Sequence, residues 1–276
     1  MHPFVKWAGG KTQLLDKLVS LMPKEYNHYF EPFIGGGALL FCIAPKNFTI
    51  NDFNSELIQA YNCFSSQDDA KKLIEKLKFH QANHSEEHYY EVRSMDKDAN
   101  FLSLPIYERA ARMIYLNKSC FNGLYRVNSK GFFNVPSGKK KTVICYDENN
   151  VQEIINFFKE SKFEILNCDF EKAVINAKKG DFVYFDPPYD TWENKESFTS
   201  YAKNPFGKDE QKRLANCFKL LSNKGVYVML SNHNTEFIRE LYKGFNIHVV
   251  EAKRMINSKA DGRGNVEEVI ITNYEG

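Results

Sequence analysis

Two successive strand–turn–helix units near the start of the chain most constrain how it can fold. The segment HYFEPFIGGGALLF (28–41) contains a short apolar strand, a glycine turn and the start of a helix. The segment NFTINDFNSELIQAYNCF (47–64) repeats the order of strand, acidic turn and helix. Successive units of this kind indicate a parallel, doubly wound α/β sheet. We expect a ligand at the carboxyl ends of its strands, where open α/β sheets bind their ligands.

The sheet pattern stops near residue 56 and resumes near residue 164. The intervening residues are polar with helical periodicity and include no convincing parallel strand. We therefore predict an α/β domain with a mostly helical insertion, divided into residues 1–55, 56–164 and 165–276. Further helices are predicted at 208–222, 235–245 and 12–23, the last capped by Thr12 and stopped by Pro23. Strand-like runs return at 163–170, 181–189, 225–232, 246–252 and 267–275.

Composition and cysteine spacing place the chain among globular intracellular proteins. It has 276 residues, of which 43% are hydrophobic and 26% charged, enough for one large domain or two smaller ones. No apolar run reaches the roughly 18 residues of a membrane span, and MHPFVKWAGGK shows no signal peptide. The six cysteines lie at least 21 residues apart, which favours neither a disulfide framework nor a C-x-x-C site. We expect a cytoplasmic protein with no membrane association.

The segment WAGGKT (7–12) ends like a nucleotide-triphosphate P-loop but does not meet its requirements. The pattern G-x-x-x-x-G-K-[ST] needs a glycine where this chain has Val5, because the backbone must wrap around a phosphate. No buried strand precedes the segment either. The sequence therefore argues against an ATPase.

The glycine turn after the first predicted strand is a candidate nucleoside site. Gly35 and Gly37 allow the backbone to approach a ligand closely, although a turn that needs positive φ would also explain them. The dinucleotide pattern G-x-G-x-x-G fails at Leu40. Asp52 follows the next strand, where its carboxylate can accept hydrogen bonds from both ribose hydroxyls. These features predict a nucleoside ligand without a pyrophosphate.

The motif DPPY (186–189) ends the apolar strand DFVYF, and its residue types suit one chemical task. The exocyclic amine of a nucleobase is a poor nucleophile because its lone pair is delocalised into the ring. The Asp186 carboxylate and the Pro187 carbonyl can each accept one N–H, which frees that lone pair. The prolines fix the backbone, and the Tyr189 ring offers a face for stacking. A simple turn at the end of a strand remains the alternative.

A basic, acid-free segment runs from Arg109 to Lys141. It carries a net charge of +8, against +2 for the whole chain. Such a run is often only a solvated surface, but here aromatic residues are interleaved with the charges. Basic groups suit phosphates and aromatic rings suit bases, so this segment is the candidate nucleic-acid surface. We expect phosphate contacts from Lys139, Lys140 and Lys141.

Three histidines, His80, His84 and His88, recur every four residues and would share one face of a helix. No acidic or cysteine ligand accompanies them at matching spacing, so we predict a polar surface and no metal site.

Six motifs occur in a characteristic order. KWAGGK, EPFIGGG and NDFNSEL come first, the insert FNGLYRVNSKGFFNVPSG follows, and the Asp-Phe of NCDF and then DPPY come last. Together they resemble the Dam-type (class D12) DNA adenine-N6 methyltransferases, in particular the branch that modifies GATC. The resemblance runs from Phe4 to about Tyr274. It implies a Rossmann-like methyltransferase sheet with an inserted target-recognition domain, S-adenosylmethionine as methyl donor and a flipped adenine in double-stranded DNA as acceptor. The family's cofactor contacts correspond to Trp7, Lys11, Asp52 and Asp186, with Asp169 and Phe170 beside the adenine of the cofactor.

The resemblance also assigns the turn FNGLYRVN to base recognition. It implies that Arg126 binds a guanine edge in the major groove while Asn122 and Leu124 contact neighbouring bases. Phe121 or Tyr125 would fill the gap left by the flipped adenine. The SGKKK that follows FNVP departs from the family pattern, which puts the flanking-base contacts in question.

Other functions fit the sequence less well. RNA or protein-amide methyltransferases usually carry Asn in place of Asp186 and lack the basic insert. A catalytically silent DNA-binding protein has no evident need for both Asp186 and Tyr189. A cytosine-C5 enzyme needs a cysteine nucleophile after a proline, and no cysteine here follows one.

Overall fold

The computed structural model describes residues 1–275 except residues 8, 12, 192–205 and 254–264. The chain divides into two compact units, each described here by itself. Unit 1 comprises residues 1–11, 34–46 and 51–167, and unit 2 comprises residues 12–33, 47–50 and 168–276.

Within the described residues, seven strands form one mixed sheet in the order β3-β2-β1-β4-β5-β7-β6. Strand β1 pairs in parallel with β2 and with β4, and β4 pairs in parallel with β5. This confirms the predicted α/β sheet, in which each predicted run forms a strand. The strands are β1 (Tyr29–Glu31), β2 (Asn47–Asn51), β3 (Lys162–Leu166), β4 (Phe182–Phe185), β5 (Tyr227–His233), β6 (Asn246–Lys253) and β7 (Asn265–Thr272).

Strand β7 differs from the expectation of a parallel sheet, because it runs antiparallel to both β5 and β6. Its register pairs Ile271 with Leu230 of β5 and with Ile247 of β6. A parallel neighbour requires a crossover connection that usually contains a helix. Only residues 254–264 separate β6 from β7, which is shorter than the roughly dozen residues that such a crossover needs, so the two strands pair in opposite directions.

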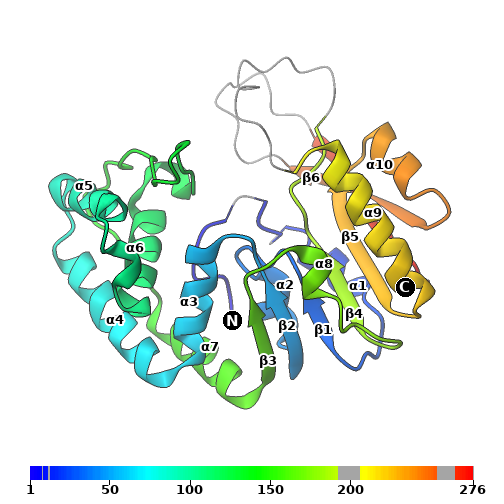
Figure 1. The fold of residues 1–276 in the computed structure, drawn as a ribbon, viewed down its shortest axis with the longest axis horizontal. Coiled ribbons are helices and arrows are strands. Elements are labelled where there is room, and N and C mark those ends of the chain that lie inside the picture. The colour runs from blue at the N-terminus through cyan, green and yellow to red at the C-terminus, as the bar shows by residue number, and fades with distance from the viewer. Residues whose placement is uncertain (8, 12, 192–205, 254–264, 276) are drawn as a thin grey trace. The chain divides into compact units, whose positions relative to one another are not determined.

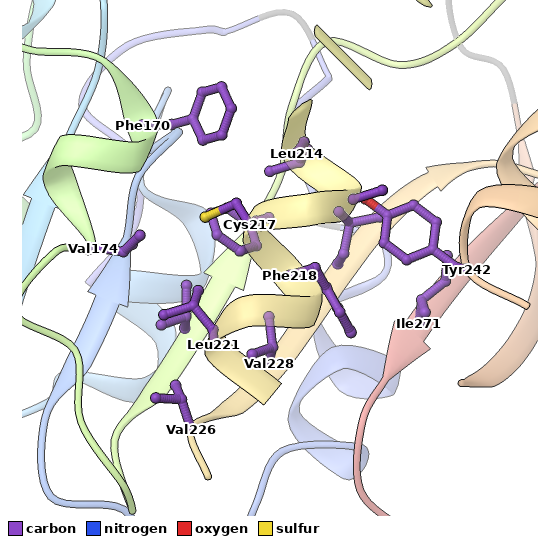
Figure 2. Packing of buried hydrophobic residues seen from close by; sticks show 14 of the residues in the cluster. Phe170, Val174, Leu214, Cys217, Phe218, Leu221, Val226, Val228, Tyr242 and Ile271 are labelled. Carbon is purple, nitrogen blue, oxygen red and sulfur yellow. The ribbon is translucent and has the colours of Figure 1, made fainter. Parts of the chain in front are cut away.

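The core of unit 2 lies where helix α9 (Lys208–Asn223) packs against the sheet. Leu214, Phe218 and Leu221 recur at helical spacing and are buried against Val228 of β5 and Ile271 of β7. Figure 2 shows these side chains gathered in one cluster. The packed cluster supports the carboxyl end of β4, where DPPY begins. The other helices of unit 2 are α1 (Leu15–Ser20), α8 (Phe170–Ala173) and α10 (Glu236–Leu241).

Unit 1 is mostly helical, and α6 lies at its centre. Helices α3, α4 and α5 all pack against α6, as Figure 1 shows in blue to green. Nearly the whole circumference of α6 is therefore buried, which holds its C-terminal end in place. The α-helices described in unit 1 are α2 (Ala38–Ile43), α3 (Ser55–Ser65), α4 (Gln67–Ala82), α5 (Glu86–Ser94), α6 (Ile106–Ser119) and α7 (Glu148–Glu160), and short 3-10 helices span Met95–Lys97, Phe101–Ser103 and Phe121–Gly123.

Side-chain caps explain where several of these helices begin. Asn54, Ser66, Ser85 and Asp147 each accept a hydrogen bond from the backbone N–H three residues further on. The predicted first helix is shorter than expected, since α1 starts at Leu15 without a side-chain cap. The proposed cap Thr12 lies outside the described residues. Among the described helices, none combines the length and the apolar character needed to cross a bilayer.

Candidate functional site

Trp7 and Lys11 belong to the WAGGK segment of unit 1, and both are held by neighbouring groups. The Lys11 side chain is buried, and its Nζ donates a 2.6 Å hydrogen bond to the carbonyl of Gly9. The Trp7 ring lies against Gly35, where an added Cβ would come within 2.8 Å of Trp7 Cδ1. The absence of a side chain at Gly35 thus lets the indole pack on the glycine turn.

The glycine turn itself is fixed from inside unit 1. Gly37 has φ 73°, and an added Cβ there would lie 2.5 Å from the Tyr61 hydroxyl. That hydroxyl donates to the carbonyl of Gly35 at 3.0 Å. Both the positive φ and the close packing therefore require glycine at this position.

Asp52 joins the glycine turn to the start of α3. Its Oδ2 accepts the N–H of Gly35 at 3.0 Å, and its Oδ1 accepts the N–H of Asn54 at 2.8 Å. Burial raises the pKa of Asp52, while these backbone hydrogen bonds lower it. The backbone N–H of Phe53 is a third donor to this carboxylate, which has about four acceptor sites, so Asp52 can still accept a hydroxyl hydrogen. Phe53, which the sequence analysis did not single out, is 88% exposed beside it.

Residues 121–126, here called the recognition turn, follow α6. They are fixed by Asn117, a fully buried residue of that helix. The Asn117 Oδ1 accepts the N–H of Lys6 at 2.8 Å. Its Nδ2 donates to the carbonyls of Lys6 at 2.7 Å and Gly123 at 3.0 Å. One amide thereby joins the segment before Trp7 to the turn of residues 121–126. Sequence reasoning missed Asn117 because its partners at residue 6 are far away in the chain.

The turn presents several predicted DNA contacts on its surface. Phe121 is 53% exposed and Leu124 is 37% exposed. Asn122 is also exposed and adopts φ 54°, a conformation that asparagine tolerates better than most residues. An added Cβ at Gly123 would come within 2.6 Å of Lys6 Cδ, so Lys6 packs directly on the turn.

Arg126 and Tyr125 have different surroundings within unit 1. The exposed Arg126 donates from Nε to Asn134 Oδ1 at 2.7 Å, which fixes the plane of its guanidinium. The Tyr125 ring lies 5.4 Å from the Trp7 ring and 5.7 Å from the Phe133 ring, measured between centroids. Burial raises the pKa of the Tyr125 phenol. Phe121 is therefore the more accessible of the two candidate wedge residues.

One residue of the basic segment is not on the surface as its charge pattern suggested. Arg112 is fully buried and pairs with Asp96 at 2.6 Å and Glu56 at 3.3 Å. Its other donors bind the carbonyls of Val92 at 3.0 Å and Arg93 at 2.9 Å. The carboxylates come from distant parts of the sequence, so local charge counting could not reveal this pairing.

The lysines of the basic segment lie nearer the surface. Lys139, Lys140 and Lys141 are exposed, and the Nζ of Lys140 donates to the carbonyl of Lys118. Burial lowers the pKa of Lys118, and the charge of nearby Lys6 lowers it further. Positive charge therefore accumulates beside the recognition turn.

The three histidines do not form the polar helix face that their spacing predicted. Helix α4 ends before His84 and α5 carries His88, so the three residues do not share one helix. His80 is 6% exposed, with Nδ1 3.0 Å from His88 Nε2. His84 Nδ1 lies 2.8 Å from the Tyr115 hydroxyl, and its Nε2 lies 3.1 Å from the carbonyl of Lys140. The prediction of a polar surface was wrong, because the turn between α4 and α5 folds these rings around Tyr115.

Unit 2 contains the DPPY motif at the carboxyl end of β4. Asp186 is half-buried, Pro187 is buried and Tyr189 is half-buried. The Tyr189 hydroxyl donates to Glu268 Oε2 at 3.3 Å, and its ring meets His233 edge-on at 4.9 Å between centroids. Burial raises the pKa of Tyr189 well above its usual range, and the Asp186 carboxylate adds to the shift. The phenol therefore stays protonated and acts as a hydrogen-bond donor.

Asp169 and Phe170 lie at the start of α8 in unit 2. Both oxygens of Asp169 accept hydrogen bonds from Arg213 Nη2, each at 2.7 Å. The Arg213 guanidinium also lies 4.6 Å from the centroid of the Phe170 ring. Phe170 is buried and packs against Phe33 at 5.4 Å. Arg213 is a partner that the sequence analysis did not foresee, since it lies on α9.

A family model described as "D12 class N6 adenine-specific DNA methyltransferase" matches residues 7–256. The chain belongs to this family. It is 49% identical to the type II methyltransferase M1.LlaDCHI of Lactococcus lactis subsp. cremoris, over 99% of this chain and 96% of the relative. It is 42% identical to the type II methyltransferase M.MjaIII of Methanocaldococcus jannaschii, over 99% of both chains. A DNA adenine methylase of Haemophilus influenzae is 35% identical, over 98% of this chain and 92% of the relative. The protein is thus an adenine-specific DNA methyltransferase, as the sequence predicted.

Proposed function

We propose that this enzyme transfers a methyl group from S-adenosylmethionine to N6 of a flipped adenine within GATC in double-stranded DNA. The GATC assignment follows the resemblance of FNGLYRVN to the GATC-modifying branch, and recognition of its guanine is supported by Arg126, whose exposed guanidinium is held in one plane by Asn134. Its remaining donors can form two parallel hydrogen bonds to O6 and N7 of one guanine, a pattern that only this base offers. The relatives named type II methyltransferases lead us to propose a role beside a restriction endonuclease.

The residues of unit 1 fit the cofactor by their chemistry. Asp52 retains an acceptor site for a ribose hydroxyl, and the exposed ring of Phe53 offers a stacking face for an adenine. Within unit 1 we assign Trp7, Lys11, Gly35 and Gly37 to cofactor binding as well. Within unit 2 we assign Asp169, Phe170 and Asp186 to cofactor binding, as the family resemblance implies. When bound, S-adenosylmethionine supplies an electrophilic methyl group on a sulfonium.

Asp186 and Pro187 activate the nucleophile in our proposal. The Asp186 carboxylate and the Pro187 carbonyl each accept one hydrogen of the adenine amine, which localises the nitrogen lone pair. Tyr189 supports the extruded base from beside them. Removing the base from the duplex costs a few kcal/mol, which stacking and hydrogen bonds in the pocket offset. The rate then depends mainly on how well these groups position the amine.

DNA binding falls to the insertion, for which we retain the boundaries 56–164. Phe121 is our choice for the residue that fills the gap in the duplex, because Tyr125 is packed against Trp7 and Phe133. Asn122 and Leu124 contact neighbouring bases, and residues 139–141 bind phosphates.

We place the enzyme in the cytoplasm, since its cysteines form no disulfide.

Plasmid protection tests the proposal directly. Purified enzyme with S-adenosylmethionine should protect GATC sites from an endonuclease that cuts only unmethylated GATC. Mapping N6-methyladenine over the plasmid should show methylation at GATC, and methylation centred on another sequence would refute the assignment. Arg126→Ala should cost roughly 1–3 kcal/mol, mainly in discrimination at the guanine. Asp186→Ala should abolish transfer in a protein that still folds.

A further inference from the structure

The backbone that follows Asp186 lacks the donors that strand pairing requires. Pro187 and Pro188 have no N–H, so this stretch donates nothing to a β-ladder. A side chain of α9 contacts it instead, because Gln211 Nε2 donates to the carbonyl of Pro188 at 2.8 Å. Gln211 is 1% exposed, so the donor of this hydrogen bond is buried.

A second buried amide fixes the orientation of the first. Asn232 of β5 is fully buried, and its Nδ2 donates to Gln211 Oε1 at 3.1 Å. Its Oδ1 accepts the N–H of Asp190 at 2.9 Å and the N–H of His233 at 2.9 Å. If Asn232 were flipped, its NH₂ group would face two donors and its oxygen would face an acceptor. Each amide therefore has one orientation that satisfies all its partners.

Asp190 closes this network on the far side of DPPY. Its Oδ2 accepts the Thr235 hydroxyl at 2.6 Å, and its carbonyl lies 2.5 Å from His233 Nδ1. Thr235 also caps α10 by accepting the N–H of Ile238 at 3.2 Å. Pro188 and Asp190, on either side of Tyr189, are thus both anchored to buried side chains of α9 and β5.

We propose that Gln211 and Asn232 are positioning residues for methyl transfer. They hold Pro188 and Asp190, and through that backbone they set the positions of the Asp186 carboxylate, the Pro187 carbonyl and the Tyr189 ring. The inference rests on the proposed catalytic role of DPPY. Small displacements of reacting groups, of the order of 1 Å, can lower a rate by about 100-fold without loss of substrate binding.

The test uses substitutions that preserve shape. Gln211→Glu and Gln211→Met both remove the donor to Pro188, and Asn232→Asp removes the donor to Gln211. We expect kcat to fall by about 10- to 100-fold at pH 8.5, while KM for DNA and for S-adenosylmethionine changes by less than about threefold. Thermal melting of each variant, read beside its kcat, separates loss of folded protein from loss of rate.

A pH profile separates positioning from a merely structural effect. The carboxyl introduced by Gln211→Glu faces the carbonyl of Pro188 in a buried site, which raises its pKa. Once protonated, it can donate to that carbonyl again. The kcat of Gln211→Glu should therefore recover toward that of wild type as the pH falls, whereas that of Gln211→Met should not.

Asn273→Asp is the matched control. Asn273 accepts the N–H of Val228 at 2.7 Å and donates to the carbonyl of Val226 at 2.8 Å, so it supports β5 without contacting DPPY. It should lower the melting temperature and leave kcat nearly unchanged. A wild-type kcat in Gln211→Glu at pH 8.5, or an equal loss of kcat in Asn273→Asp, would overturn the inference. Full activity of Asp186→Ala would instead overturn the catalytic role on which it rests.

Discussion

Replacing Asn117 with Asp should lower the stability of unit 1 and impair the two functions that we propose for it, cofactor binding and base recognition. The substitution keeps the shape of the side chain and the oxygen that accepts the N–H of Lys6. It removes the NH₂ group, which donates at 2.7 Å to the carbonyl of Lys6 and at 3.0 Å to that of Gly123. The buried carbonyl of Gly123 and the partly buried carbonyl of Lys6 would then lose their donor and face a second oxygen.

The size of the effect follows from those two hydrogen bonds. Leaving a buried polar group without its partner costs about 1–3 kcal/mol, so two such groups predict a loss of about 2–6 kcal/mol. That is a large part of the roughly 5–15 kcal/mol by which domains are usually stable. In the folded variant, Lys6 and Gly123 lose the hydrogen bonds that hold them to Asn117. The adjoining Trp7 and recognition turn should therefore become more mobile. We therefore expect weaker cofactor binding and more methylation at near-cognate sites in the same variant.

Urea unfolding, cofactor titration and methylation mapping of wild type and Asn117→Asp measure these three quantities. Asn83→Asp serves as the control, because the exposed Asn83 amide makes one hydrogen bond, to the carbonyl of Phe79 at 2.8 Å. The control should lose less than about 1.5 kcal/mol and keep its specificity. A stable Asn117→Asp protein with unchanged cofactor affinity and unchanged specificity would refute the reasoning.

Three further variants test other parts of unit 1. Arg112→Met should cost about 3–5 kcal/mol in urea unfolding, because it leaves the carboxylates of Glu56 and Asp96 without their buried cation, and a loss below about 1 kcal/mol would contradict the pairing. Burial, and after it the charges of His88 and Lys76, lowers the pKa of His80 from 6.5 to about 4. The unfolded chain therefore binds a proton on this residue at a higher pH than the folded chain does. As a result, the free energy of unfolding falls as the pH drops from 6.5 toward 4. His80→Phe keeps a ring stacked on Tyr115 and should remove up to about 3 kcal/mol of this pH-dependent loss of stability. If the free energy of unfolding of His80→Phe depends on pH as in wild type, the lowered pKa of His80 is not its cause. Replacing the lysines at 139–141 with Gln should reduce the slope of log affinity against log salt concentration by up to about 3 units, equally for all DNA sequences. An unchanged slope would show that these lysines do not contact phosphates.

The sheet could be predicted from sequence because its signals are local. The alternation of strand, turn and amphipathic helix placed β1, β2, α9 and α10 correctly. The apolar residues that an element buries recur at a spacing that is visible within a few residues of sequence. The direction of β7 was not foreseen, because it depends on how the chain returns rather than on the residues of the strand itself. Motif order likewise predicted the family, which the comparisons confirmed.

Partnerships across long stretches of chain could not be predicted in the same way. Arg112 looked like a surface charge until its carboxylates, Glu56 and Asp96, were known. The histidine spacing suggested a single helix, although the chain turns between His80 and His88. Gln211 carries no sequence signal that distinguishes it from an ordinary polar residue on a helix. In each case the deciding neighbour lies on another element, which only the fold brings close.

The place of β7 in the sheet also bears on how the protein is made. β7 lies between β5 and β6, yet it is synthesised after both of them. Until residues 265–272 have left the ribosome, β5 and β6 each present an unpaired strand edge. Such edges can pair with other chains, so the nascent protein passes through an aggregation-prone stage. The half of the enzyme that carries Asn232 and DPPY therefore completes its fold late in synthesis, and we expect chaperones that shield strand edges to raise the yield of active enzyme.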